Sequence, residues 1–130
     1  KNKNEVINAY TDIVSSKDYY SLNVPKLAFD KSKNLLYMSR SNIPGNKKNK
    51  FIKSYKQVCI YSFPYKYLEV FGKTTKKTQF ENIEDIEILR FLELGINVKM
   101  FKVSKSSIGV DTIDDLKKVE RIIKNNKKKI

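Results

Sequence analysis

The sequence predicts an α/β fold in which a mixed sheet has helices on its flanks. Two units in which a strand leads directly into a helix favour this class. In the first, an apolar strand over 56–63 leads into a short helix, and in the second, a strand over 108–110 leads into a helix over 112–124. A chain of 130 residues can bury one core but is short for two. One core is therefore expected over 1–130.

The first third of the chain predicts a helix followed by a hairpin. Apolar residues recur at helical spacing over 4–14 and indicate a short amphipathic helix. Two β-rich segments follow at 24–29 and 35–38, and the polar cluster at 30–34 between them is typical of a hairpin turn. A proline, a glycine and several lysines then predict a turn and a loosely ordered loop that ends at Ser54.

The segment 56–63 is continuous and apolar enough for a buried central strand. Cys59 lies within it and is expected to be a buried thiol that behaves as a small hydrophobe. Pro64 suits the first position of the next helix, and Gly72 is expected to end that helix. Because Cys59 is the only cysteine, no intramolecular disulfide can form, and a reducing compartment is indicated.

A longer, continuous helix is predicted over 78–94. Thr78 and Glu81 have the spacing of a capping box, and Gly95 is suited to close the helix. Its apolar positions are expected to bury one broad face, and they are Ile83, Ile86, Leu89, Phe91, Leu92 and Leu94. A strand over 98–103 is expected after this helix.

The net charge of +13 would ordinarily indicate binding to nucleic acid or to another anionic surface. The lysines, however, are scattered over predicted loops and helix exteriors and are interleaved with asparagines, which indicates a compositional bias toward both residues. We therefore expect no nucleic-acid partner, and a disordered basic tail over 125–130. A non-catalytic basic module that binds RNA or anionic surfaces is the alternative interpretation.

Composition also limits compartment and chemistry. No apolar stretch reaches the ~20 residues of a membrane-spanning helix, and the N-terminus lacks the apolar core of a signal peptide. A cytoplasmic protein with no membrane partner is expected. The chain has no histidine, which excludes the usual zinc sites and histidine-based nucleophilic catalysis. Any chemistry must use carboxylates, Lys, Arg, Tyr and a metal ion.

Asp111 is the first candidate functional residue. It follows a short apolar strand and precedes a helix, so it is expected at the carboxyl edge of the sheet, where open α/β folds bind ligands. Thr112 and Asp115 can cap the helix by themselves, which leaves Asp111 available. A carboxylate there could hold Mg²⁺ and offset phosphate charge. The alternative is that Asp111 is an ordinary turn or capping residue.

Arg40 closes a predicted strand, so its guanidinium is expected to extend beyond the sheet edge. A sugar-acid carboxylate would fit its bidentate geometry, and a surface ion pair is the alternative. The helix over 78–94 also carries several acids in its first turns, and these are Glu81, Glu84, Asp85 and Glu87. Because a helix dipole favours acids near its start, this cluster has a purely structural explanation as well.

Four blocks follow one another along the chain, and they are Tyr37-Met38-Ser39-Arg40-Ser41-Asn42-Ile43-Pro44, Lys56-Gln57-Val58-Cys59-Ile60-Tyr61, the segment 80–92, and Gly109-Val110-Asp111-Thr112. In this order they resemble the carboxyl-terminal half of the 3-deoxy-manno-octulosonate (Kdo) cytidylyltransferases, or CMP-Kdo synthetases, and of their sialate-activating relatives. The resemblance covers about 24–120. The Ser-Arg-x-x-Ile-Pro and Gly-Val-Asp-Thr blocks are fairly specific together and weak singly.

The resemblance implies a Rossmann-like nucleotidyltransferase fold and a Mg²⁺-dependent transfer of CMP from CTP to the anomeric hydroxyl of a 2-keto sugar acid. Pyrophosphate is released, and the product serves surface polysaccharide or lipopolysaccharide synthesis. By position, Asp111 matches the family's metal-binding aspartate and Arg40 an arginine that contacts the sugar acid. Tyr61 and Glu87 match residues that line the sugar pocket. A homodimer is also implied, with the hairpin over 24–38 as its candidate contact, and no residue here is expected to act covalently.

Two departures from the family concern the sugar. Gln57 stands where enzymes acting on Kdo itself usually have a histidine, and Ile88 where they have a glutamine that touches the sugar. Since an unpaired buried polar group costs about 1–3 kcal/mol, we expect Gln57 to bind substrate and the substrate to be an amino-substituted Kdo or a nine-carbon relative. The family's Gly-rich CTP-binding loop has no counterpart, so the chain alone is expected to be inactive. A dimerisation fragment without ligand is the third interpretation.

Overall fold

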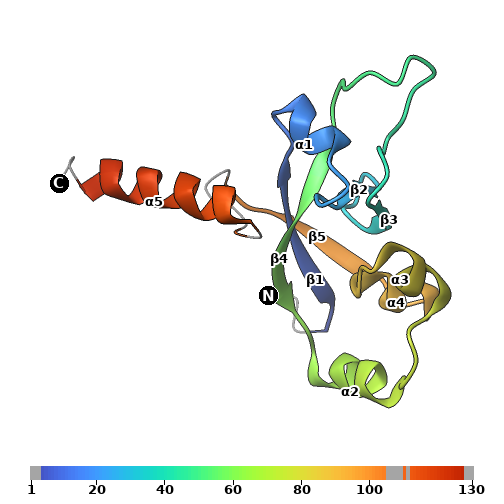
Figure 1. Ribbon diagram of the computed structural model, residues 1–130. Helices are drawn as coiled ribbons and strands as arrows, with labels where there is room; N and C mark the ends of the chain where they lie inside the picture. The colour runs from blue at the N-terminus through green and yellow to red at the C-terminus, as the bar shows by residue number, and fades with distance from the viewer. Residues whose placement is uncertain (1–3, 105–109, 111, 128–130) are drawn as a thin grey trace.

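The computed structural model describes residues 4–104, 110 and 112–127. Within them, five strands form one sheet in the order β3-β2-β4-β1-β5 (Figure 1). The strands are β1 (Val6–Asp12), β2 (Lys26–Phe29), β3 (Leu35–Ser39), β4 (Tyr55–Ser62) and β5 (Val98–Lys102). β1 and β5 are parallel, whereas β1–β4, β2–β4 and β2–β3 are antiparallel. The mixed sheet with flanking helices predicted from the sequence is confirmed.

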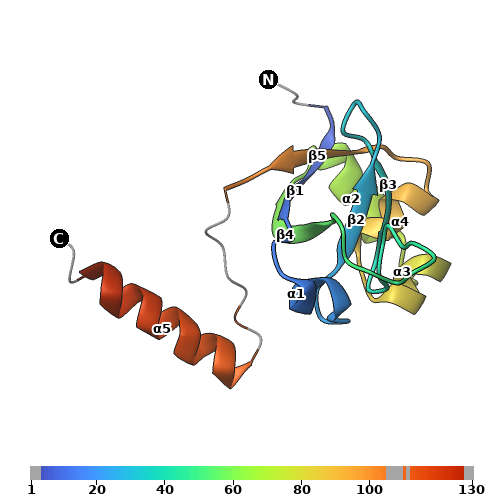
Figure 2. The same ribbon diagram turned by 90° about the horizontal axis from the view of Figure 1, so that it is seen from above.

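The helices are α1 (Ser16–Tyr20), α2 (Tyr65–Lys73), α3 (Gln79–Glu84), α4 (Ile88–Glu93) and α5 (Ile113–Lys127). The core lies between the sheet and the α3–α4 segment, and its central members are Val6, Tyr10, Leu27, Met38, Ile88, Leu89, Phe91, Val98 and Met100. The two views in Figures 1 and 2 both show α5 extending away from the sheet and the other helices. The sheet and α1 to α4 therefore form the body of the molecule.

The helix predicted over 4–14 is wrong, because this segment contains strand β1. β1 lies between β4 and β5, and five of its seven residues are buried. A strand buried on both faces loses the alternation of polar and apolar residues that would identify it in a sequence. The apolar positions of β1 therefore match helical spacing by coincidence.

The predicted hairpin is confirmed as β2 and β3, and its turn is held by local hydrogen bonds. The carboxylate of Asp30 accepts from the backbone N–H of Asn34 at 2.8 Å and from its side-chain amide at 2.9 Å. These bonds lower the pKa of Asp30. Within the turn, Lys33 adopts a positive φ of 66° and its carbonyl accepts from the N–H of Met100 in β5 at 2.8 Å. The turn thus reaches the far edge of the sheet.

The single helix predicted over 78–94 is also wrong, although its caps are confirmed. Thr78 and Glu81 form the capping box, and Gly95 has a φ of +73°. Between them the chain breaks at Asp85, which adopts a left-handed conformation with φ 52°. The Arg40 side chain donates to the carbonyls of Glu84 at 2.6 Å and Asp85 at 3.1 Å. A continuous helix would need those carbonyls as acceptors for its own next turn.

The break also changes which apolar side chains are covered. Ile86, Leu89 and Phe91 are buried as predicted, but Ile83 and Leu94 are exposed. α2 agrees better with expectation, since it begins after Pro64, although it continues through Gly72 to Lys73. The predicted helix is thus confirmed, but it ends after Gly72 rather than at it.

The prediction of a buried β4 is wrong in part. The strand occupies the centre of the sheet, but Cys59 is exposed and Ile60 is 58% exposed. The first four residues of β4 are partly buried, whereas its last four, 59–62, are exposed, so side chains of both alternating directions are uncovered in that half of the strand. The expected buried thiol is therefore an exposed one.

Two further expectations concern the end of the chain. The capping box at Thr112 is confirmed, because its hydroxyl donates to the Asp115 carboxylate at 2.7 Å and accepts from the N–H of Asp115 at 3.2 Å. α5 runs to Lys127, so residues 125–127 of the predicted disordered tail are helical, and 128–130 lie outside the described residues. The predicted strand over 108–110 also falls mostly outside them. Among the described residues no helix is long and apolar enough to cross a membrane.

Candidate functional site

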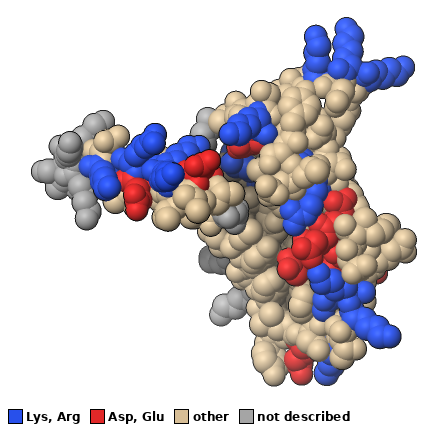
Figure 3. All heavy atoms as spheres, viewed as in Figure 1, with Lys and Arg blue, Asp and Glu red and all other residues tan. Residues whose placement is uncertain are grey.

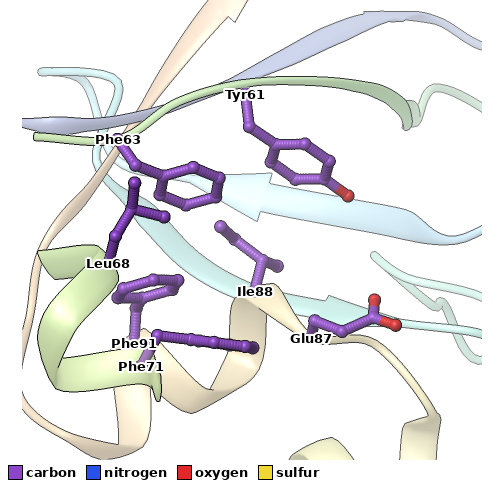
Figure 4. Close-up of a pocket in the computed structure, with 7 residues that line it drawn as sticks. All are labelled: Tyr61, Phe63, Leu68, Phe71, Glu87, Ile88 and Phe91. Carbon is purple, nitrogen blue, oxygen red and sulfur yellow. The ribbon is translucent and has the colours of Figure 1, made fainter. Parts of the chain in front are cut away.

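A pocket of about 230 Å³ lies between the end of β4, α2 and the start of α4. Its lining consists of Tyr61, Phe63, Leu68, Phe71, Glu87, Ile88 and Phe91 (Figure 4). Three aromatic pairs stack along it with ring centroids 5.3 to 5.5 Å apart, namely Tyr61–Phe63, Phe63–Phe91 and Phe71–Phe91. An apolar concavity with a few polar groups is the usual form of a small-molecule site.

Two polar groups face this pocket, and they come from different elements. Tyr61 is on β4, and Glu87 is the residue that precedes α4. Figure 4 shows the Tyr61 hydroxyl and the Glu87 carboxylate on the same side of the pocket, away from Leu68 and Phe71. The pocket therefore combines an apolar wall with one hydroxyl and one carboxylate.

A β-bulge sets the position of Tyr61. Asn8 of β1 is opposite Tyr61, whereas the next residue, Ala9, is opposite Val58. The buried side-chain amide of Asn8 donates to the carbonyls of Val58 and Ile60, each at 3.1 Å. Bulges commonly redirect side chains beside functional sites. Asn8 thus stabilises the irregular part of β4 that carries the pocket tyrosine.

Gln57 joins this network. Its Nε2 donates to Asn8 Oδ1 at 3.2 Å and to the Tyr61 hydroxyl at 3.0 Å. Burial is the main cause that raises the pKa of Tyr61, and the neighbouring Cys59 and Glu87 raise it further, whereas the bond from Gln57 lowers it. The net pKa lies well above the ordinary value of a tyrosine, so the hydroxyl keeps its proton at neutral pH.

A buried ion pair supports the opposite wall of the pocket. The Arg90 guanidinium donates to both carboxylate oxygens of Glu81 at 2.6 Å, and Glu81 is only 1% exposed. The same guanidinium donates to the carbonyls of Phe71 and Thr74 at the end of α2 and lies 3.8 Å from the Phe71 ring centroid. Arg90 therefore holds α2, and with it Phe71, against α3 and α4.

Arg40 belongs to a second cluster, at the end of β3. The Glu84 carboxylate accepts from the Ser39 hydroxyl at 2.6 Å and from the Arg40 backbone N–H at 2.9 Å. The Arg40 guanidinium donates to three backbone carbonyls, those of Leu22, Glu84 and Asp85. Buried Lys26 donates to the carbonyls of Ser21 and Arg40, and its burial lowers its pKa. This cluster joins the hairpin to the break between α3 and α4.

Known proteins resemble this chain in both sequence and architecture. The chain is 32% identical over 133 residues to the 3-deoxy-manno-octulosonate cytidylyltransferase of Thermodesulfovibrio yellowstonii, covering 95% of this chain and 51% of that protein. A solved structure of CMP:2-keto-3-deoxy-manno-octonic acid synthetase complexed with CTP superposes with a TM-score of 0.82 at 27% identity, over 95% of this chain and 50% of that one. In sequence and in fold, the chain corresponds to about half of a CMP-Kdo synthetase. No family model matches it.

Other CMP-Kdo synthetase relatives give the same result. The enzyme of Fusobacterium nucleatum is 35% identical over 118 residues, covering 91% of this chain and 48% of that protein. The 8-amino-3,8-dideoxy-manno-octulosonate cytidylyltransferase of Shewanella baltica is 33% identical over 96 residues, covering 74% of this chain and 39% of that protein. The chain thus spans about half the length of the curated relatives it matches.

The structure brings together three of the five site residues expected from the resemblance to CMP-Kdo synthetases. Tyr61 and Glu87 line the pocket, and Gln57 is bonded to Tyr61. Arg40 is not among the lining residues. Asp111, expected to be the metal ligand, lies outside the described residues, and no three His, Cys, Asp or Glu side chains within the described ones are grouped to hold a metal ion.

Two residues that organise the pocket were missed in the sequence. Asn8 is a polar residue between apolar ones, which was a usable signal, but the assignment of that segment as a helix concealed it. Arg90 and Glu81 are nine positions apart, beyond any regular helical spacing, so their pairing depends on the break at Asp85. Local sequence carries no signal for that contact.

Proposed function

We propose that this chain is the sugar-binding portion of a cytidylyltransferase that transfers CMP from CTP to a 2-keto sugar acid in the cytoplasm. The anomeric hydroxyl oxygen would bond to the α-phosphorus of CTP, its proton would leave, and pyrophosphate would depart. The observation that carries the proposal is the convergence of Tyr61 and Glu87 in one pocket, at the positions that match the family's sugar-binding residues. Relatives named for this activity support it.

The pocket residues would bind and orient the sugar rather than react with it. Glu87 would accept hydrogen bonds from sugar hydroxyl or ammonium groups, and Tyr61 would contact a sugar oxygen. The rings of Phe63, Phe71 and Phe91 would exclude water around them. Since phosphoryl-transfer chemistry depends largely on positioning and charge neutralisation, such binding is a sufficient role for this chain.

The substrate we propose is an amino-substituted Kdo or a nine-carbon relative. Ile88 presents a buried apolar side chain to the pocket, at the position where the Kdo enzymes have a glutamine that touches the sugar. A sugar hydroxyl placed against Ile88 would lose its hydrogen bond, which costs about 1–3 kcal/mol. Similarity to an 8-amino-3,8-dideoxy-manno-octulosonate cytidylyltransferase supports the amino-sugar reading.

The remaining roles concern charge and assembly. Arg40 uses three of its five N–H donors on carbonyls, so two are left for a sugar-acid carboxylate. Asp111 would contribute a carboxylate to a Mg²⁺ site together with groups from outside this chain, and the metal would neutralise phosphate charge. The β2–β3 hairpin is the proposed homodimer contact.

The test is pyrophosphate release from CTP and Mg²⁺ with a panel of 2-keto sugar acids. The chain alone would be compared with the same chain joined to a nucleotide-binding half from a relative, and activity is expected only in the joined protein. Arg40→Ala and Asp111→Ala are each expected to reduce that activity, whereas Lys47→Ala in an exposed loop is not. Survival of activity in both variants would refute these assignments. A folded joined protein that is inactive with every sugar would refute the function.

The same preparation tests the RNA-binding alternative. Figure 3 shows basic side chains on separate parts of one face, on α5 and at the tip of the loop before β4, rather than in one patch. Strongly salt-dependent binding to a polynucleotide would favour the basic module. Binding that is weak and unaffected by salt would leave the cytidylyltransferase proposal as it stands.

A further inference from the structure

We propose that Asn8 is a positioning residue, which acts through Gln57 so that the Tyr61 hydroxyl is presented to the pocket as a hydrogen-bond donor. The inference starts from the bulge between β1 and β4. There the Asn8 side chain bonds to two backbone carbonyls and to Gln57, and Gln57 bonds to Tyr61. Only the last step of this inference, the contact between the Tyr61 hydroxyl and a sugar oxygen, rests on the proposed function.

The bulge determines which way the Asn8 amide faces. The carbonyls of Val58 and Ile60 can only accept hydrogen bonds, so the group 3.1 Å from each must be the amide nitrogen of Asn8. The Asn8 oxygen is thereby directed to Gln57, at 3.2 Å. Because Asn8 is fully buried, its amide nitrogen has no water to donate to in place of these carbonyls. The orientation of Asn8 is therefore set by the backbone.

The orientation of Asn8 in turn determines that of Gln57. Facing an oxygen acceptor, Gln57 must offer its Nε2, whose second N–H then donates to the Tyr61 hydroxyl oxygen at 3.0 Å. The hydroxyl hydrogen of Tyr61 must consequently point away from Gln57. Within the described surroundings it faces the pocket and Cys59, whose sulfur is a weak acceptor.

This relay of hydrogen bonds, from Asn8 through Gln57 to Tyr61, specifies the kind of ligand group that fits the pocket. The pocket offers one donor, the Tyr61 hydroxyl, and one acceptor, the Glu87 carboxylate, beside the apolar side chain of Ile88. A ligand must therefore place an oxygen acceptor at Tyr61 and a hydroxyl or ammonium donor at Glu87. Reversing the side-chain amide of Gln57 would turn its oxygen toward Tyr61. The Tyr61 hydroxyl would then donate to Gln57, and the pocket would be left with two acceptors.

The test is the ¹³Cζ chemical shift of Tyr61 in the tyrosine-labelled full chain, with the signal assigned by Tyr61→Phe. Gln57→Met removes the donor and preserves side-chain length, and Asn8→Leu removes the oxygen to which Gln57 donates at similar side-chain volume. Each variant is expected to move the Tyr61 signal. In the Gln57→Met background, Asn8→Leu is expected to move it no further, because the relay is already cut.

A purely structural role for Asn8 predicts the opposite result. If Asn8 acted only through the bulge backbone, its substitution would move the Tyr61 signal equally in both backgrounds, and the relay would be refuted. Asn82→Leu, on an exposed face of α3, is the matched control and should leave the signal in place. Should Asn8→Leu fail to fold, deuterium exchange of the unsubstituted chain decides, since rapid exchange of the Asn8 side-chain amide would also refute the relay.

A second measurement connects the relay to the ligand. Affinity for 3-deoxy-manno-octulosonate and for its 8-amino analogue would be measured with the joined protein. Gln57→Met is expected to weaken binding of the preferred sugar by about 3- to 10-fold, and Gln57→His, which restores an N–H donor, to recover most of the loss. Equal affinity of all three proteins would refute a role in recognition. Absence of sugar binding in every form would instead refute the proposed function, while the Tyr61 shifts would still decide the relay.

Discussion

Gly95 and Gly72 illustrate how one residue type serves two positions differently. Gly95 ends α4 with a φ of +73°, which an L-residue adopts only with strain, whereas Gly72 lies within helix α2 with no heavy atom within 4 Å of an added Cβ. Gly95→Ala is expected to lower the free energy of unfolding by about 1–2 kcal/mol. Gly72→Ala is expected to raise it by about 0.5–1 kcal/mol, because alanine loses less backbone entropy in a helix.

Urea unfolding of the two variants checks this pair. Since both substitutions add the same methyl group, each is a control for the other. An equal effect of both on the free energy of unfolding would contradict the conformational explanation.

Among the elements, the contact between α2 and the α3–α4 segment depends most on one residue. Arg90 is 8% exposed and pairs with a Glu81 carboxylate that is 1% exposed, so removing the arginine leaves a buried charge without its partner. Arg90→Met is expected to lower the free energy of unfolding by about 3–5 kcal/mol. The exposed Arg121→Met in α5 is the control, and a loss below about 1 kcal/mol at Arg90 would contradict the prediction.

The same ion pair predicts sensitivity to acid. Hydrogen bonds from Arg90 are the main cause that lowers the pKa of Glu81 in the folded state. A carboxyl whose folded pKa is lowered stabilises the fold above its unfolded pKa, about 4.3 for glutamate, and loses that contribution as the pH falls through the folded value. The free energy of unfolding should therefore decline below about pH 4.3.

Urea unfolding measured from pH 7 to pH 3 checks the acid sensitivity. Glu81→Gln removes the titrating group, so its free energy of unfolding should decline less steeply over the acidic part of that range. An identical decline in both proteins would show that other carboxyls cause the acid sensitivity.

At the scale of the whole molecule, the sheet exposes large apolar side chains on β4 and β5. Phe101 of β5 and Ile60 of β4 are 63% and 58% exposed, and both are directed away from the core. Parallel strand pairs such as β1–β5 are normally covered on both faces. The chain is therefore expected to self-associate when it is prepared alone.

Sedimentation velocity over a range of concentrations checks the self-association. Phe101→Ser is expected to reduce it by removing exposed apolar area, whereas Leu36→Ser, an exposed position on β3, should have less effect. Monomeric behaviour of the unsubstituted chain at every concentration would contradict the prediction.

The positions of most helices and strands depend on local chemistry. The sequence by itself therefore determined many of these positions. The capping boxes at Thr78 and Thr112, the polar turn between β2 and β3 and the closing Gly95 are signals contained within a few neighbouring residues. They allowed the hairpin, β4, β5, α2 and α5 to be predicted. Tyr61, Glu87 and Gln57 were found by position within a family pattern, and the pocket and its hydrogen bonds contain all three.

Only the tertiary structure decided the rest, because the deciding groups come from distant parts of the chain. β1 is a strand because β4 and β5 pair with it on both sides, which its own spacing does not encode. The helix breaks at Asp85 because Arg40, forty-five positions earlier, bonds the carbonyl there. The polarity of the pocket depends in the same way on Asn8, fifty positions before the carbonyl of Val58 that orients it. Buried backbone groups must find hydrogen-bond partners wherever the fold supplies them, and that requirement is not local.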